Sequence, residues 1–472
     1  MSWNIVKIGK VLKQYRIEHW VQNDKLYKQV SILNDGSVVL RGEKIGKEIG
    51  RKRQFIINLD KHPDTLIFTR QLLLQGSIGM ASKEVNGCIV TENMPMFSVD
   101  GIIPQFLFYF IKSELFKAQV RNLKTSGTAQ KSLHERQFLD LEIPLPPLKE
   151  QREIIARCKL YQSNYEKIDK EIYNQQTHLQ LLRQAILQEA VQGKLTKQNK
   201  DDEPADKLLQ RIKAEKQKLV ATGKLKKEKE LPPITDEEIP FELPKGWVWC
   251  RLGEIINEFL GGYAFKSTDL KKDGKNQVIR LGNVKNDKVL LSANPVFINE
   301  AMSNEASTNQ LYTGDILITM TGTRLKRDYC YTVLLNEKDF IEKQLFLNQR
   351  VGCLRFNKQL NLGFVNLALK ADNILDFIFN AETGTANQGN IGVGNIKSTP
   401  FPLPPLSEQH RIVAKVQQLL QLVNELEQQV AHSQVQAGQL LQAVLKEAFA
   451  KTPANKGSGY AENEMITMAA EE

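Results

Sequence analysis

Basic residues interleaved with glycine stand out in the first part of this sequence. Six cations lie near Gly42, Gly46 and Gly50: Arg41, Lys44, Lys47, Arg51, Lys52 and Arg53. Because glycine has no side chain, the backbone there can approach a phosphate as closely as the cations do. The pattern indicates contact with the phosphates of a nucleic acid. The alternative interpretation is an ordinary solvated basic loop.

Two loops further along the chain combine glycine with ring or hydroxyl side chains and cations. The first contains Gly262, Tyr263, Phe265 and Lys266, and the second contains Thr323, Arg324, Lys326 and Arg327. Aromatic rings can stack on bases, and one arginine can donate two hydrogen bonds to a base edge. We therefore predict that both loops contact DNA, again with a solvated basic loop as the alternative.

No pattern in the sequence is typical of an enzyme that acts on nucleic acid. A G-x-x-x-x-G-K-[ST] loop is absent, and Gly392-Val393-Gly394 lacks the strand and helix that flank a dinucleotide-binding loop. Asn294-Pro295 lacks the second proline and the aromatic residue with which adenine methyltransferases grip a base. The histidines do not cluster, and the cysteines form no C-x-x-C pair. We predict no catalytic, cofactor-binding or metal-binding residue in this chain.

Length and charge limit the class of protein. A chain of 472 residues is well above the ~150 residues of one domain, so two or three domains are expected. The net charge of +10 favours a polyanionic partner such as nucleic acid. No apolar run approaches the ~20 residues of a membrane helix, and the start of the chain lacks a signal-peptide core. We expect a cytoplasmic protein without a membrane contact.

The elements that position these loops are indicated by an internal repeat. The run IPLPPLKEQ at Ile143–Gln151 returns as FPLPPLSEQ at Phe401–Gln409, and the match continues without a gap well beyond the prolines. A looser similarity links Trp3–Gly9 with Trp247–Gly253. The chain is therefore interpreted as two half-molecules joined in tandem.

After each proline-rich run, apolar residues recur at alternating steps of four and three, which predicts two long helices with one apolar seam each. The seam of the first helix is formed by Ile154, Cys158, Tyr165, Ile168, Ile172, Leu179, Leu182 and Ile186. The seam of the second is formed by Ile412, Val416, Leu419, Val423, Leu426, Val430, Leu440 and Val444. We predict that the two seams pack together as an intramolecular coiled coil. Alternatively, each seam packs on its own globular domain or on a second chain.

The remaining sequence divides at these helices into segments of different composition. Short β-branched and aromatic runs mixed with helical stretches predict α+β domains. The charged segment between the halves shows no apolar face and is expected to be a solvated linker helix. The expected segments are two globular domains (1–145 and 243–402), two repeat helices (146–196 and 403–450), a charged linker (197–242) and a disordered tail (451–472).

The duplicated P-L-P-P-L-x-E-Q motif, the heptad helices and the two unlike flanking domains resemble the specificity (S) subunit of type I restriction-modification systems. This resemblance implies an α+β protein with two target-recognition domains, separated by two helices that pack antiparallel. It implies that each domain reads one half of an asymmetric bipartite site in double-stranded DNA. Antiparallel pairing would place Ser433 near Tyr165 and Gln175 near Val423.

The resemblance also implies partners. Two methyltransferase (M) subunits would dock around the helices, and restriction and translocation (R) subunits would join through them. The partners would bring S-adenosylmethionine, ATP and magnesium, and this chain would be a non-catalytic subunit. Two other classes stay open: an autonomous DNA methyltransferase or nuclease, and a purely structural coiled-coil adaptor.

Overall fold

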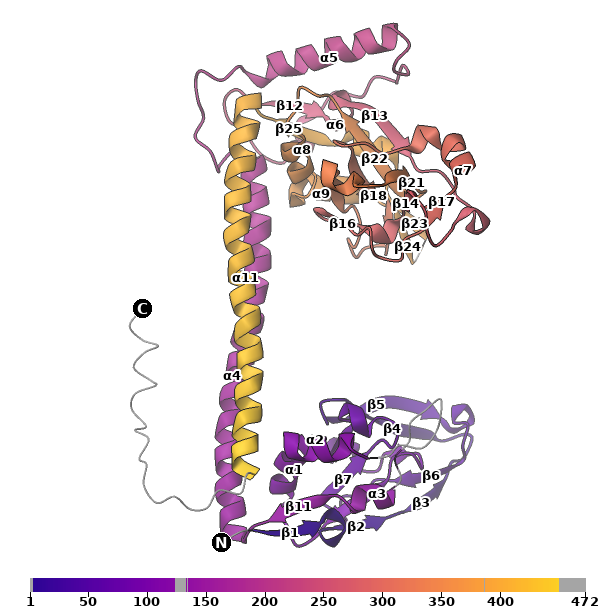
Figure 1. Ribbon diagram of the computed structural model, residues 1–472, viewed down its shortest axis with the longest axis vertical. Coiled ribbons are helices and arrows are strands. Elements are labelled where there is room, and N and C mark those ends of the chain that lie inside the picture. Colours follow the sequence, from indigo (N-terminus) through magenta and orange to yellow (C-terminus); the bar gives the residue numbers. More distant parts are fainter. Residues whose placement is uncertain (1–2, 124–132, 134, 386, 450–472) are drawn as a thin grey trace. The chain divides into compact units, whose positions relative to one another are not determined.

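The computed structural model describes residues 3–123, 133, 135–385 and 387–449, and it divides into two compact units (Figure 1). Unit 1 comprises Met1–Asn174 with Ala431–Glu472, and unit 2 comprises Gln175–Val430. Helices α4 (Leu148–Val191) and α11 (Leu406–Phe449) each contribute one part to both units. The fold mixes helices and sheets, as predicted. The expected tail at 451–472 lies outside the described residues.

Unit 1 is built on two sheets. The four-stranded sheet has the order β2-β10-β7-β8: Leu12–Tyr15, Met96–Val99, Thr65–Phe68 and Ile78–Met80. The five-stranded sheet has the order β3-β6-β9-β4-β5: Glu18–Trp20, Arg53–Ile56, Ile89–Val90, Leu26–Ile32 and Val38–Ile45. The helices are α1 (Pro104–Lys112), α2 (Glu114–Arg121) and α3 (Glu135–Leu139). Phe68, Phe97, Phe106, Phe110 and Phe138 are fully buried in the core of this unit.

Unit 2 has a corresponding four-stranded sheet and smaller ones. The four-stranded order is β13-β22-β18-β20: Ile256–Gly261, Val351–Phe356, Ile316–Thr319 and Thr332–Leu334. The order β17-β14-β21 comprises Phe297–Ile298, Asn276–Ile279 and Gln344–Leu347, and β19-β24-β23 comprises Thr321–Gly322, Gln388–Asn390 and Thr383–Thr385. Strand β15 (Val284–Lys285) pairs with β16 (Lys288–Val289). The helices are α5 (Ala205–Ala221), α6 (Leu252–Ile255), α7 (Glu300–Glu305), α8 (Leu362–Ala368), α9 (Asp372–Asn380) and α10 (Val393–Ser398).

A two-stranded ribbon joins each globular part to its long helix. In unit 1, β1 (Asn4–Lys7) pairs antiparallel with β11 (Glu142–Leu145). In unit 2, β12 (Val248–Arg251) pairs antiparallel with β25 (Pro400–Leu403). The first proline of the repeated motif, Pro144 or Pro402, lies in the second strand of the ribbon, and the Pro-Pro pair that follows stands between this strand and the long helix. The duplication seen in the sequence is therefore present as a duplicated ribbon.

The glutamate of each repeat binds the tryptophan of the looser sequence similarity. Trp3 Nε1 donates to Glu150 Oε2 at 2.6 Å, and Trp247 Nε1 donates to Glu408 Oε2 at 2.8 Å. Each glutamate lies in the first turn of its helix, where a negative charge is favourable to the helix dipole. One hydrogen bond therefore attaches the first strand of each globular part to its long helix.

The glutamine that follows each glutamate makes a second equivalent attachment. Gln151 Oε1 accepts from the Ile103 amide at 2.9 Å, and Gln409 Oε1 accepts from the Asn361 amide at 3.0 Å. Ile103 and Asn361 are the residues just before α1 and α8. Both glutamines are buried, and each also donates to a carbonyl of its own proline run. The glutamine thus fastens the start of one domain helix to one long helix in both halves.

The long helices run in opposite directions where they contact each other in unit 2. Thr196 Oγ1, just beyond the end of α4, donates to Glu408 Oε1 at the start of α11 at 3.0 Å. Arg183 forms an ion pair with Glu427 at 2.8 Å and also donates to Asn424. The register predicted above would have placed Lys415 beside Arg183, so that register is wrong, and α11 is displaced along α4 by about two to three turns.

The predicted seams are only partly buried. The buried members are Ile154, Cys158, Ile172, Leu179, Ile186, Ile412, Val416 and Val423, and the half-buried ones are Tyr165, Leu419, Val430 and Val444. The prediction is wrong for Ile168, Leu182, Leu426 and Leu440, which are exposed. Ile172, Leu179 and Ile186 are seven residues apart, so the contact follows one position of the heptad. Of the other heptad position, Ile154 and Ile412 are buried in the core clusters of the globular parts. The exposed members lie further along the helices, where a second helix covers only a narrow stripe.

The expectation of a solvated linker helix without an apolar face is also wrong. Helix α5 buries Ala205, Leu208, Leu209 and Ile212, which join the core cluster of unit 2. Their spacing is the helical pattern of i, i+3, i+4 and i+7. The dense lysines and glutamates that follow them conceal this short stripe in the sequence. The linker is therefore a packed part of unit 2.

The described residues contain no disulfide, no helix long and apolar enough to cross a membrane, and no cluster of three metal-binding side chains. The five cysteines are free and buried. Burial raises the pKa of the Cys158 thiol to about 11.

Candidate nucleic-acid interface

Both loops predicted in the second half lie along one edge of the four-stranded sheet of unit 2. Strand β13 ends where β22 begins, since Gly261 pairs with Gly352. Strand β18 also ends there, since Thr319 pairs with Val351. The loops 262–266, 348–350 and 320–331 therefore leave the sheet at the same edge, which we call the loop edge of unit 2.

The loop at 262–266 is packed tightly against the loop at 348–350. Tyr263 donates its amide to Leu347 O at 2.9 Å, and the Gln349 amide donates to Tyr263 O at 3.0 Å. A Cβ at Gly262 would lie 1.9 Å from Asn348 O, so only glycine fits there. The Tyr263 hydroxyl donates to Glu305, and this hydrogen bond raises the pKa of the tyrosine.

The side chains of this loop divide between surface and core. Lys266 is exposed and Tyr263 is half-buried. Phe265 is buried among Val278 and Phe346, so its position does not support the expectation that it stacks on a base. Its aromatic ring belongs to a small core cluster of unit 2.

A polar hollow of about 450 Å³ lies beside this loop. Its lining includes Arg280, Asn294, Asn348, Gln349 and Arg350. Arg280 Nη2 donates to Asn294 O at 2.6 Å, and the buried Asn348 Oδ1 has no hydrogen-bond partner among the described residues. Arginine pairs with guanine edges, and asparagine or glutamine pairs with adenine edges. The hollow therefore carries the side-chain chemistry of base recognition.

Composition did not reveal the hollow, because its residues come from three separate segments. Arg280 follows β14, Asn294 precedes β17, and Asn348–Arg350 lie between β21 and β22. Taken by itself, none of the three segments is rich in cations or in glycine. The available signal was that Arg280-Leu-Gly-Asn283 and Asn348-Gln-Arg350 place amide and guanidinium groups together in short loops.

The loop at 323–327 is held by its own side chains and backbone. Thr323 donates its amide to Asp328 Oδ1 at 2.7 Å, and hydrogen bonds from Thr323 lower the pKa of Asp328. Arg324 Nη1 donates to Gly384 O at 3.3 Å, and Arg327 forms an ion pair with Asp376 at 2.6 Å. Arg324, Lys326 and Arg327 are all exposed, and Arg327 also lies over the ring of Phe379. Arg327 thus has a structural contact in this fold.

The basic run of unit 1 belongs to the five-stranded sheet and its loops. Arg41 and Lys44 are exposed on β5, and Lys47 is exposed in the turn after it. The remaining three cations have internal partners. Lys52 Nζ donates to Gly46 O at 2.6 Å, Arg51 lies 3.5 Å from Glu92, and Arg53 pairs with Glu18.

The corresponding edge of the four-stranded sheet in unit 1 has different chemistry. Two arginines converge on Glu135: Arg70 Nη2 lies 2.6 Å and Arg16 Nη2 lies 3.3 Å from Glu135 Oε1. Gln14 also donates to this carboxylate at 2.9 Å. This cluster was not among the predicted site residues, because its members are far apart in the chain. The two halves therefore present unlike polar groups at equivalent sheet edges.

Comparisons with known proteins agree with this duplicated architecture. Residues 3–176 and 244–433 match the family described as the type I restriction modification DNA specificity domain. These two ranges cover most of the chain, and the protein belongs to this family.

Individual relatives in this family carry the same designation. The chain is 31% identical over 370 residues to the type I restriction enzyme EcoAI specificity subunit of Escherichia coli, covering 69% of this chain and 61% of that protein. It is 26% identical over 429 residues to the EcoEI specificity subunit of E. coli, covering 81% and 69%. The chain thus spans less than two thirds of the EcoAI subunit.

A solved structure from a study of complex assembly and conformational transition of the type I R-M system shares the fold. It has a TM-score of 0.62 and 19% sequence identity, over 95% of this chain and 97% of that chain.

Proposed function

We propose that this chain is the DNA sequence-specificity subunit of a type I restriction-modification complex and that it acts in the cytoplasm. Residues 1–145 and 243–402 are its two target-recognition domains, and together they read an asymmetric bipartite site in double-stranded DNA. The observation that carries the proposal is the repeated attachment: two unlike domains are fastened to the long helices by the same E-Q contacts. Two domains that are attached in the same way but have different surfaces suit a DNA site whose two halves differ in sequence.

The loop edge of unit 2 is the proposed reading surface of the second domain. It combines the polar hollow with the exposed Arg324, Lys326 and Lys266. Cations on exposed loops suit phosphates, and the amide and guanidinium groups of the hollow suit base edges. In the first domain, Arg41, Lys44 and Lys47 are the proposed phosphate contacts. Arg51, Lys52 and Arg53 stay secondary candidates because they have internal partners.

The helices at 146–196 and 403–450 are the proposed scaffold, as an antiparallel coiled coil around which two methyltransferase subunits dock. Apolar residues on the exposed faces of both helices support this role, since exposed apolar patches mark protein interfaces. They are Leu160, Ile168, Leu181 and Leu182 on α4, and Leu422, Leu426, Val435 and Leu440 on α11. Restriction and translocation subunits would join through the methyltransferases. These partners would carry S-adenosylmethionine, ATP and magnesium, and this chain would contribute no catalytic group.

The test is methylome sequencing of cells with and without the gene. We expect a bipartite N6-methyladenine mark that vanishes on deletion. Replacing residues 243–402 with the corresponding domain of a relative should change one half of the marked site only. A change in both halves would refute the assignment of one domain to each half-site.

Two other classes predict different results. If the chain were an autonomous methyltransferase or nuclease, the purified chain alone would modify DNA. If it were a structural adaptor, Arg324→Ala would leave the affinity of the complex for its DNA site unaltered.

A further inference from the structure

The loop at 323–327 displays an apolar side chain on a strained backbone. Leu325 is 86% exposed and has a φ of 65°. Arg327 and Cys330 in the same connection also have positive φ. Left-handed backbone is unfavourable for residues other than glycine and persists only where the surroundings enforce it. Because Leu325 is exposed, its side chain contributes no apolar burial to the fold. The folded chain by itself therefore gives no reason for a leucine at this position.

The surroundings enforce the conformation through Glu382. One of its carboxylate oxygens accepts the Leu325 amide at 3.2 Å, and the other accepts the hydroxyl of the buried Tyr329 at 2.6 Å. The Lys326 amide donates to Thr323 O at 3.2 Å and closes the turn. The tip of the loop is therefore fixed, and Leu325 is held outward.

Cations flank the leucine, and the loop shares its edge with the polar hollow. Arg324 and Lys326 are exposed on either side of Leu325. The Met320 amide donates to Arg350 O at 3.0 Å, which links the start of this connection to the lining of the hollow. An apolar tip between two cations matches DNA at a base step, where an apolar wedge separates the bases and cations bind the adjacent phosphates.

We propose that Leu325 is a wedge that enters one base step in or beside the second half of the DNA site, with Arg324 and Lys326 on the flanking phosphates. This inference rests on the proposed function, because it requires that the second domain bind duplex DNA. Unstacking the step opens the groove at the position where the hollow reads base edges. The strain at Leu325 pre-organises the side chain, so no ordering of the loop opposes insertion.

The experiment uses the full chain assembled with its methyltransferase subunits. The probe is a duplex with the site identified by methylome sequencing, in which 2-aminopurine replaces single bases across the second half-site and its flanks. This base analogue fluoresces when it is unstacked. With the wild-type chain we expect a several-fold rise in fluorescence at one step. With Leu325→Ala we expect that rise to disappear and the affinity to fall about tenfold.

Two variants separate insertion from folding. Leu325→Gly relieves the left-handed backbone, so we expect a melting temperature no lower than that of the wild type together with loss of the fluorescence rise. Ile341→Ala removes another exposed apolar side chain of unit 2, itself 68% exposed, and should change neither measurement.

The possible failures are distinguishable. If the wild-type complex does not bind the duplex, the proposed function fails and the wedge with it. If it binds and no position brightens, or if Leu325→Ala keeps both affinity and fluorescence, the wedge alone is wrong. If Leu325→Ala instead releases a methyltransferase subunit and keeps the fluorescence rise, the leucine is a protein contact and the wedge is overturned.

Discussion

The two ribbons that fasten the domains to the helices share their tryptophan, glutamate and glutamine contacts but differ at the end of their first strand. In unit 1 the last residue of β1 is Lys7, whose side chain is 64% exposed and pairs with Asp140 at 2.7 Å. In unit 2 the last residue of β12 is Arg251, whose side chain is 4% exposed. The same backbone element thus lies at the surface in one half and is covered in the other.

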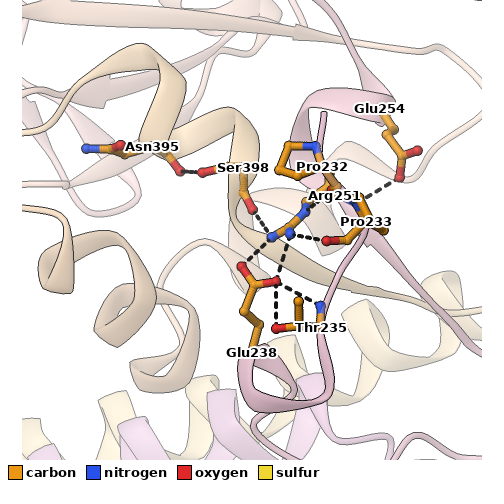
Figure 2. Close-up of polar contacts among 8 residues, drawn as sticks. All are labelled: Pro232, Pro233, Thr235, Glu238, Arg251, Glu254, Asn395 and Ser398. Carbon is orange, nitrogen blue, oxygen red and sulfur yellow. Dashed lines mark hydrogen bonds and ion pairs between the residues drawn. The ribbon is translucent and has the colours of Figure 1, made fainter. Parts of the chain in front are cut away.

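Arg251 is covered by the end of the linker, and its hydrogen bonding is complete (Figure 2). Its Nε donates to Pro232 O at 2.9 Å. One Nη donates to Glu238 and to Ser398 O, and the other donates to Glu238 and to Pro233 O, all at 2.6–2.8 Å. All five N–H groups of the guanidinium therefore have partners. The repeat therefore specifies how each domain is attached to its long helix, whereas the linker additionally covers the ribbon of unit 2.

The largest expected effect comes from removing the buried member of this pair. Arg251→Ala would leave Glu238 and three carbonyls without their partner, and breaking a buried ion pair costs about 3–5 kcal/mol. Lys7→Ala removes an exposed pair and should cost at most about 1 kcal/mol. Urea denaturation of the full chain measures both losses.

Arg251→Lys is the matched control, because it keeps the charge and loses the planar fork. We expect a loss of stability between those of the wild type and Arg251→Ala. Equal losses for Arg251→Ala and Lys7→Ala would show that the linker does not bury the ribbon of unit 2 in solution.

A smaller, symmetric effect is expected at the repeated glutamines. Gln151→Ala would leave the Ile103 amide without its acceptor, and Gln409→Ala would do the same to the Asn361 amide. An unsatisfied buried donor costs about 1–3 kcal/mol. The two losses should agree within about 0.5 kcal/mol by urea denaturation, since both sites have the same contacts. A loss confined to one half would break the equivalence of the two attachments.

The contacts between tryptophan and glutamate join residues of the repeated segments, and a repeat places like residues in like positions. The partners of the glutamines, Ile103 and Asn361, lie outside those segments and could not be predicted from them. The partners of Arg251 could not be predicted, because the linker that supplies Glu238 has no counterpart in the other half of the repeat. Likewise, the packing of α5 could not be predicted, because its stripe of four apolar residues is short and lies next to many lysines and glutamates.

For the candidate interface, composition identified exposed cations such as Arg324 and Lys44, because charge and glycine content are local properties. It could not distinguish the buried Phe265 from the half-buried Tyr263, since burial depends on strands that lie elsewhere in the chain. The polar hollow was missed for the same reason: Arg280 and Arg350 meet only when the sheets form.

The ion pair between Arg251 and Glu238 should also make the stability of unit 2 depend on pH in the acid range. The Arg251 guanidinium holds the pKa of Glu238 at about 2, compared with 4.5 without such contacts. The unfolded chain therefore binds this proton more readily, and the stabilisation present above about pH 4.5 is lost as the pH falls toward 2. Urea denaturation at several pH values should show a shallower pH dependence for Glu238→Gln. An unchanged dependence would show that other carboxyl groups dominate in this range.

The smallest expected effect on stability lies at one pair of equivalent exposed positions on the long helices. Ile168 and Leu426 occupy the same place in the two repeats, and both are 44% exposed. Ile168→Ala and Leu426→Ala should each cost about 0.5 kcal/mol, as at other surface sites. Each should nevertheless weaken co-purification of the proposed methyltransferase subunits, and the two together should do so more than either alone.

Val423→Ala, at a buried position of α11, is the control, because it should lower stability by more than either exposed variant does. Full retention of both subunits by the double variant would contradict docking on this face, and a loss in one half only would show that the two methyltransferases bind the scaffold differently.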